Sequence, residues 1–141
     1  MNKLLEQGSY FVCGSAKNHG MGVTWYASED GSIFAEITLT KAQQGPPKLA
    51  HGGATAALLD EAMGAAVWQA GHKAAAINLN INYHKPVSLG EKIRVRGRIK
   101  SVDGRKIFAT GTIMLPDGTV AVSGKGIYVE AEHLFADLFS E

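Results

Sequence analysis

The chain has 141 residues, which is enough for one domain with a sizeable core and too few for two. Hydrophobic residues make up 45% of the chain and charged residues 19%, a composition that excludes disordered and membrane proteins. The formal net charge of +1 gives no overall field for nucleic acid or an anionic membrane, so local groups must hold any anionic ligand. The single cysteine, Cys13, excludes an internal disulfide and no secretory signal is recognisable, so we expect a cytoplasmic protein.

The first third of the chain predicts a β-hairpin. Asn2–Tyr10 has few apolar residues and predicts only a short helix or a loose arm. Met21–Ser28 and Ser32–Thr40 are rich in β-branched and aromatic residues, and the turn signal Glu29-Asp30-Gly31 lies between them. The next segment contains Gly45-Pro46-Pro47, which excludes both a helix and a central strand and predicts an irregular loop.

A long helix is predicted over about Gly53–Ala70. Strong helix formers occupy most of these positions, and the helix is apolar nearly all round, so other elements must cover it. Polar residues interrupt the apolar stretch at Thr55, Asp60, Glu61 and Gln69. These interruptions predict a core helix rather than a membrane span.

The remainder of the chain predicts strands. Four segments alternate or run apolar: Ala75–Tyr83, Lys92–Val102, Lys106–Leu115 and Thr119–Glu130. Tight-turn signals separate the last three, which predicts an antiparallel meander, and His133–Phe139 predicts a short closing helix. We find no repeat or linker, so residues 1–141 are expected to form a single α+β domain. Its antiparallel β-sheet of about five to six strands would wrap around one long central helix.

Two places on the predicted helix carry candidate chemistry. His51-Gly52-Gly53 opens it, and the glycines leave backbone N–H groups uncovered at its positive end, which can bind an anion or polarise a carbonyl. The alternative is that these glycines only make a sharp turn. Asp60 lies mid-helix among apolar neighbours, where a carboxylate without a function is costly. The alternatives are that Asp60 lies on a solvated helix edge facing a partner subunit, or that Glu61 is the functional carboxylate.

The spacing of these groups predicts a shared site. Asp60 lies about 10 to 12 Å along the helix axis from Gly52 and Gly53, so one helix cannot bring both to one atom. If the glycine N–H groups polarise a carbonyl that the carboxylate attacks, or at which it activates water, two antiparallel copies of the helix must contribute. We therefore expect an active site that is shared across a dimer.

Two other strands place polar side chains on one face. Asn78, Asn80 and Asn82 alternate with apolar residues, and they either line a polar ligand groove or face water. Basic side chains occupy one face of the following strand: Arg94, Arg96, Arg98 and Lys100. A charged outer face is the favoured interpretation of this stripe, and phosphate contacts to a nucleotide-bearing ligand are the alternative.

Several chemistries lack their motifs. The five histidines show no HxH or HExxH spacing, so no metal site is expected. The chain also has no GxSxG elbow, no Walker A loop and no GxGxxG after a strand. A serine hydrolase, an NTPase and a nicotinamide-dependent dehydrogenase are therefore disfavoured.

The ordered combination of His51-Gly52-Gly53, Asp60 seven residues after Gly53, and the run Asn78–Val87 with Gly90 beyond resembles the PaaI-like and thioesterase superfamily members of the hotdog fold. The resemblance covers most of the chain, including Cys13–Gly22. It implies hydrolysis of an acyl-CoA thioester to a carboxylic acid and free CoA, with no metal and no cofactor apart from the CoA of the substrate. It also implies a homodimer with shared sites, or a tetramer built from two such dimers.

The resemblance assigns roles to individual residues. The backbone N–H of Gly52 would polarise the thioester carbonyl, and Asp60 of the neighbouring subunit would act as nucleophile or as general base. His51 would orient the substrate or the loop. The remaining expected substrate-binding residues are Gly53, Asn78, Asn80 and Lys85, with Lys85 and the basic stripe as candidates for the CoA phosphates.

Two departures from the family pattern affect the expected reaction. Ala76 stands where close relatives often have a threonine or serine that assists the water, and Gln44 or Gly45 stands where many have an asparagine. A protein that binds acyl-CoA without turning it over is therefore one alternative. The other is an acyl-thioester hydratase or dehydratase, which would need a His and Asp pair for which no motif is present.

Overall fold

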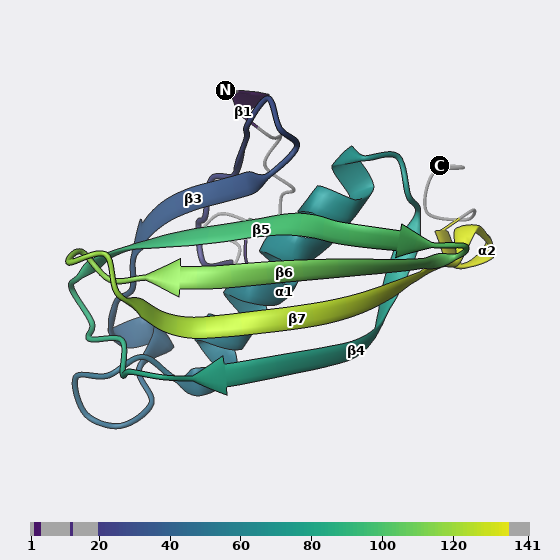
Figure 1. Cartoon of the computed structure of the whole chain (residues 1–141). Helices are drawn as coiled ribbons and strands as arrows, with labels where there is room; N and C mark the ends of the chain where they lie inside the picture. Colours follow the sequence, from purple (N-terminus) through teal and green to yellow (C-terminus); the bar gives the residue numbers. More distant parts are fainter. Residues whose placement is uncertain (1, 4–11, 13–19, 136–141) are drawn as a thin grey trace.

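The computed structural model describes residues 2–3, 12 and 20–135, whose strands form one antiparallel sheet (Figure 1). The long strands are β3 (Ile33–Thr38), β4 (Ala74–Tyr83), β5 (Lys92–Asp103), β6 (Lys106–Met114) and β7 (Val120–Glu130). Two strands of two residues each, β1 (Asn2–Lys3) and β2 (Tyr26–Ala27), extend the sheet beyond β3. The strand order is β1-β2-β3-β5-β6-β7-β4, so the predicted meander β5-β6-β7 is confirmed. The predicted α+β class is also confirmed.

The segment before β3 departs from the prediction. The hairpin is confirmed because β2 pairs with β3, but of Met21–Ser28 only Tyr26–Ala27 forms a strand. Val23 and Trp25 are buried in the core instead, and the Val23 N–H donates to the Val12 carbonyl oxygen at 3.1 Å. The side chains of this segment gain more from packing against the core than its backbone would gain from a longer β-ladder.

At the start of the chain the prediction is wrong, and at the end the short closing helix is confirmed over the residues that the structure describes. A helix or loose arm over Asn2–Tyr10 is wrong at Asn2–Lys3, which pair with β2 because that short strand has a free backbone edge. The rest of Asn2–Tyr10 lies outside the described residues. At the other end α2 spans Glu132–Phe135, and the remainder of the predicted helix His133–Phe139 lies outside the described residues.

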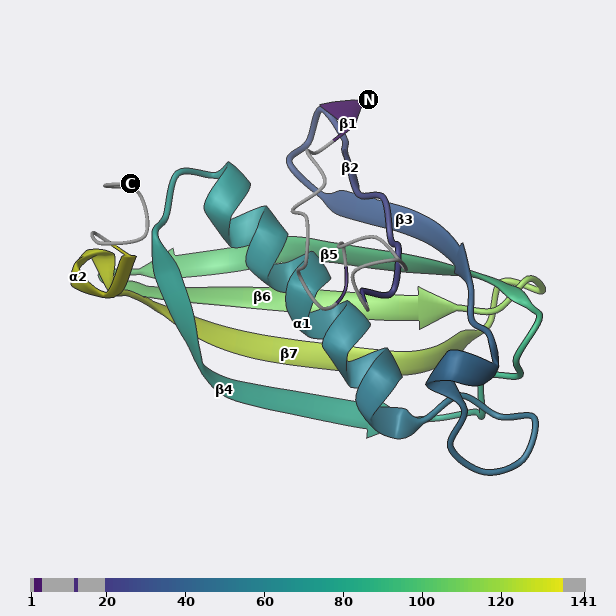
Figure 2. The ribbon, with the colours of Figure 1, turned by 180° about the vertical axis from the view of Figure 1, so that it is seen from behind.

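Helix α1 (Gly52–Gln69) matches the predicted helix closely and crosses one face of the sheet (Figure 2). The residues that it buries form a stripe toward the strands: Ala54, Thr55, Leu58, Leu59, Ala62, Met63, Ala66 and Val67. The side of α1 that carries Ala57, Asp60 and Gly64 is only partly buried. Within one chain the sheet therefore covers only half of a helix that is apolar on nearly all sides.

A row of glycines lets α1 lie very close to the sheet. Gly97, Gly111 and Gly124 are direct neighbours across β5, β6 and β7. A Cβ atom on Gly97 would lie 2.5 Å from the backbone carbonyl carbon of Ala62 in α1. A Cβ atom on Gly111 would lie 3.0 Å from the Leu59 side chain. The three glycines thus provide a shallow trough under α1, in which the helix backbone approaches Gly97 and the Leu59 side chain lies over Gly111 and Gly124.

Strand β4 forms one edge of the sheet and pairs only with β7 among the described strands. Its register shifts between Ala76 and Asn78, so Ile77 is a bulge. Apolar side chains remain exposed along this edge strand, with 59% of Ile77, 39% of Leu79 and 57% of Tyr83 accessible to solvent. An apolar edge strand of ten residues is a surface that proteins normally cover.

Candidate active site

The N-terminus of α1 has a free backbone donor. His51 caps the helix, because its backbone is extended and its Nδ1 atom accepts the Gly53 N–H at 2.8 Å. The carbonyl oxygen of His51 accepts the N–H groups of Ala54 and Thr55 at 3.0 and 3.3 Å. The Gly52 N–H has no partner among the described residues. The donor to which sequence analysis assigns carbonyl polarisation is therefore available to a ligand.

The His51 cap also fixes the histidine ring. Since Nδ1 accepts a hydrogen bond, the proton of the neutral imidazole resides on Nε2, which is free to donate. A Cβ atom on Gly53 would lie 2.9 Å from this Nδ1, so a side chain there would displace the ring. Gly45 packs as closely, since its own Cβ would lie 2.9 Å from the His51 Cα. The expected role of His51 in orienting the loop agrees with these contacts.

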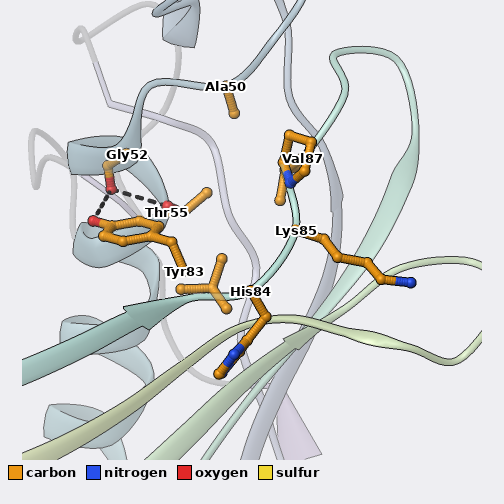
Figure 3. A pocket seen from close by; sticks show the side chains of 9 residues that line it. Ala50, Gly52, Thr55, Tyr83, His84, Lys85 and Val87 are labelled. Carbon is orange, nitrogen blue, oxygen red and sulfur yellow. Dashed lines mark hydrogen bonds between the residues drawn. The ribbon is translucent and has the colours of Figure 1, made fainter.

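Strand β4 anchors the first turn of α1 (Figure 3). The Tyr83 hydroxyl donates to the Gly52 carbonyl oxygen at 2.8 Å, and the Thr55 hydroxyl donates to the same oxygen at 2.9 Å. A Cβ atom on Gly52 would lie 3.3 Å from the Tyr83 hydroxyl oxygen. The edge strand and the N-terminus of the helix therefore form one connected unit.

Two hollows flank this helix end. One, of about 200 Å³, is lined by Gly52, Thr55 and residues 83–87 of the chain leaving β4. The other, of about 630 Å³, includes Thr40, Gln43, His51 and Gly53 in its lining. Gly52, whose N–H has no partner among the described residues, thus contributes to the lining of the smaller hollow.

Asp60 and Glu61 face different parts of the molecule. The Tyr128 hydroxyl donates to Asp60 Oδ1 at 3.0 Å and lies 3.1 Å from the Asp60 carbonyl oxygen. Glu61 Oε2 instead accepts the indole N–H of Trp25 at 2.8 Å. Trp25 is buried and precedes β2, so Glu61 points toward the side of the fold that includes β2. Asp60 lies over β7, which is the strand next to the β4 edge.

The sequence pattern did not identify Tyr128 as a site residue. Its side chain is buried, and this burial raises the pKa of the phenol far above its ordinary value, with the charge of Asp60 as the second cause. The only sequence signal is the alternation Gly124-Gly126-Tyr128 on the inner face of β7, where two glycines precede one large side chain. That pattern is also typical of ordinary core packing.

The two expected asparagines lie apart from this end of α1. Asn78 and Asn80 pair across the ladder with Ile127 and Lys125, on the sheet face away from the helix, and both are exposed. The Asn80 side chain accepts a hydrogen bond from Asn82 at 3.1 Å. Within one chain the structure therefore does not bring either asparagine to Gly52, and their substrate contacts stay a prediction.

The basic side chains lie on the outside. Lys85 is exposed in the loop after β4 and points away from Gly52 in Figure 3. Arg94 pairs with Glu36 at 3.4 Å and Arg96 with Asp30 at 3.3 Å, so acidic partners neutralise part of the stripe. These pairs agree with the favoured interpretation of the stripe as a charged outer face.

Two further features bear on the expected chemistry. The residues that the structure describes include no group of three or more His, Cys, Asp or Glu side chains placed to hold a metal ion. In that same part of the chain, no helix combines the length and the apolar character needed to cross a membrane.

Comparison with known proteins decides the family. The family model of the thioesterase superfamily matches residues 48–122, which is more than half of the chain and contains α1 with its N-terminal motif. The chain belongs to the thioesterase superfamily. The resemblance inferred from His51-Gly52-Gly53, Asp60 and Asn78–Val87 is thereby confirmed.

Named relatives of this thioesterase superfamily chain agree with the assignment. It is 36% identical over 98 residues to acyl-coenzyme A thioesterase THEM4 of Mus musculus, covering 70% of this chain and 40% of that protein. The chain thus spans well under half the length of the curated relatives that it matches.

Solved structures of the superfamily agree as well. The crystal structure of a thioesterase superfamily protein is 39% identical with a TM-score of 0.77, covering 79% of this chain and 55% of that one. The E. coli PaaI protein from the phenylacetic acid degradation operon shares the fold at 17% identity, with a TM-score of 0.75 and coverage of 83% and 85%. The predicted hotdog fold is confirmed by these likenesses.

Proposed function

We propose that this protein hydrolyses acyl-CoA thioesters to a carboxylic acid and free CoA. The observation that carries the proposal is the Gly52 N–H, which has no partner among the described residues. It belongs to a residue that lines a hollow, in a chain of the thioesterase superfamily. Relatives named acyl-coenzyme A thioesterase at about one third identity support the acyl-CoA substrate class. The cytoplasm is the location that we expect.

In the proposed reaction the thioester carbonyl oxygen accepts the Gly52 N–H. Negative charge grows on this oxygen when the carbonyl carbon is attacked, so a donor at the positive end of a helix stabilises the transition state more than the substrate. His51 holds the loop that presents this donor, because its ring accepts the neighbouring Gly53 N–H. The Nε2–H of His51 is a second donor available to the substrate.

Asp60 supplies the attack. As general base it takes a proton from water while the water oxygen bonds to the carbonyl carbon, and the C–S bond then breaks to release CoA thiolate, which recovers the proton. As nucleophile its carboxylate forms an acyl anhydride, expels the thiolate and is regenerated by water. A thiolate leaves readily without strong acid assistance, so one carboxylate and one polarising donor are sufficient groups for either route.

The two groups come from different subunits in this proposal. Gly52 and Asp60 are eight residues apart on α1, which is about 12 Å along the axis, so a second copy must complete each site. The β4 edge supports a twofold dimer, because its exposed Ile77, Leu79 and Tyr83 side chains and unpaired backbone suit a second β4 strand. Two such copies place their α1 helices side by side and antiparallel, and the half-buried side with Asp60 becomes covered.

Binding of the CoA moiety is assigned to the exposed cations nearest the helix end. Lys85 lines the hollow beside Gly52, and it is our candidate for a phosphate contact. Gly53, Asn78 and Asn80 complete the proposed substrate-binding set, with the asparagines contributing from the sheet face opposite α1. The functional unit is a homodimer, or a tetramer formed by two such dimers.

The test is thiol release from a panel of short, medium, long and aromatic acyl-CoAs. We expect turnover with the wild type, loss of turnover with Asp60→Asn and retention with Glu61→Gln, since Glu61 is bonded to Trp25. The reverse result would keep the reaction and move the catalytic role to Glu61. Tight binding of CoA esters without any thiol release would identify a binding protein instead.

A further inference from the structure

A buried hydroxyl lies against the carboxylate of Asp60. Tyr128 is 3% exposed, in the inner face of β7, and its hydroxyl oxygen lies 3.0 Å from Asp60 Oδ1 and 3.1 Å from the Asp60 carbonyl oxygen. It is the only side-chain hydroxyl bonded to this carboxylate among the described residues. A hydroxyl has one hydrogen to donate, so Tyr128 either orients the carboxylate or docks the helix backbone, or shares its hydrogen between the two.

Glycines on both sides leave room for the Tyr128 ring in this position. A Cβ atom on Gly126, two residues before it in β7, would lie 2.7 Å from the ring carbon Cε1. A Cβ atom on Gly64, one turn after Asp60 in α1, would be in ordinary contact with the ring at 3.8 Å. The ring therefore occupies space that side chains at these two positions would take, and this packing lets its hydroxyl reach Asp60.

The environment of the hydroxyl favours its protonated form. Burial raises the pKa of Tyr128 above its ordinary value, and the Asp60 charge raises it further. Toward an ionised carboxylate, which can only accept, the hydrogen bond runs from Tyr128 to Asp60. Opposite Tyr128 in the β4–β7 ladder lies Ala76, on the same sheet face and without a hydroxyl. Of this cross-strand pair, only Tyr128 therefore offers a hydroxyl to Asp60.

We propose that Tyr128 is a positioning residue for Asp60, holding Oδ1 so that Oδ2 faces the water or thioester carbonyl in the shared site. The proposal rests on the proposed thioesterase function. In it, Oδ1 of Asp60 accepts the Tyr128 hydroxyl while Oδ2 takes part in the reaction. Without the Tyr128 hydroxyl the Asp60 carboxylate could rotate, and it would spend less time in a reactive orientation. The ionised carboxylate would also lose a hydrogen bond that stabilises it.

The test compares Tyr128→Phe with Tyr26→Phe. Both remove one phenol hydroxyl and keep the ring, but Tyr26 lies on β2, where its ring stacks on Phe34 at 5.8 Å, away from Asp60. For Tyr128→Phe we expect kcat to fall roughly tenfold to a hundredfold at nearly unchanged KM, because a hydrogen bond to a charged group is lost. The acidic limb of the kcat profile should move to higher pH. Tyr26→Phe should match the wild type in all three quantities.

A merely structural role would lower the melting temperature of Tyr128→Phe and leave its kcat and pH profile unchanged, which would overturn the proposal. If Tyr128→Phe does not fold, Gly126→Ala keeps the hydroxyl and displaces the ring through its added Cβ, and a folded Gly126→Ala enzyme with wild-type kcat would overturn the proposal equally. Asp60→Asn separates the two ideas. An active Asp60→Asn enzyme refutes the proposed function, whereas an inactive one beside a fully active Tyr128→Phe enzyme refutes only the role of Tyr128.

Discussion

The Gly52 N–H can be deleted without removing any side chain. Gly52 is the first residue of α1, a position where helices readily accept proline because its N–H has no intrahelical partner. His51 before it has φ −64° and ψ 133°, which is the extended conformation that a following proline requires. Gly52→Pro is therefore expected to fold with α1 intact and without the donor that we assign to the thioester oxygen.

The size of the effect follows from losing one donor to a developing oxyanion. Such a loss lowers kcat by about 10²- to 10³-fold, or roughly 3 to 4 kcal/mol of transition-state stabilisation. Gly52→Ala is the matched control, because both variants add a Cβ about 3.3 Å from the Tyr83 hydroxyl but alanine keeps the N–H. We expect Gly52→Ala to stay within about threefold of the wild type, since Tyr83 need move only a few tenths of an ångström.

The assay is steady-state thiol release with the best acyl-CoA of the panel, accompanied by the melting temperature and the oligomeric state of each variant. The reasoning predicts a large kcat difference between the proline and alanine variants at equal stability. Equal kcat values in the two folded variants would show that the N–H at this position does not stabilise the reacting oxygen. The oxyanion donor would then have to be sought elsewhere, with the His51 Nε2–H as the next candidate.

Three more predictions test the shared site and the packing that supports it. Mixing and refolding equal amounts of inactive Asp60→Asn and Gly52→Pro chains should restore about a quarter of wild-type turnover, because mixed dimers carry one intact site out of two; no recovery would mean that each site is built within one chain. Ile77→Lys should convert the dimer to monomer in light scattering and abolish turnover, because it puts a charge on the apolar β4 edge, whereas Val102→Lys on an exposed part of β5 should stay dimeric. Gly97→Ala should lower the free energy of unfolding by at least about 2 kcal/mol and the melting temperature by roughly 5 to 10 °C, since its Cβ would lie 2.5 Å from the α1 backbone. An unchanged melting temperature would contradict the close contact.

Elements whose signal is local were predictable from the sequence. The apolar stretch after His51-Gly52-Gly53 is helical from Gly52 to Gln69, within one residue of the expected bounds at each end. The Asp-Gly turns correctly separate the last three strands, because such turns depend on two or three neighbouring residues. The proposed site with two copies of α1 rests on the spacing of the motif residues along one helix, so it could be inferred from the sequence alone.

Features that depend on distant partners were not predictable. Asp60 and Glu61 have similar neighbours in the sequence, and they differ only because Tyr128 and Trp25 reach them from opposite sides of the fold. Met21–Trp25 has the composition of a strand, but the burial of Trp25 against α1 determines its conformation. The face of the sheet on which Asn78 and Asn80 lie follows from the β4–β7 register, including the bulge at Ile77.

The glycine trough under α1 has a consequence for how exactly the two active sites must be built. Each proposed site takes the N-terminus of one α1 and the mid-helix carboxylate of the other. If both helices shift along their troughs, the donor and the carboxylate of each site therefore move in opposite directions. A displacement of about 1 Å per subunit would change the separation of donor and carboxylate by about 2 Å, which is enough to stop a reaction that depends on contact distances. Gly97, Gly111 and Gly124 are distant in the sequence from Gly52 and Asp60. Because a shift of α1 counts twice in each site, these glycines determine how precisely the donor and the carboxylate are placed.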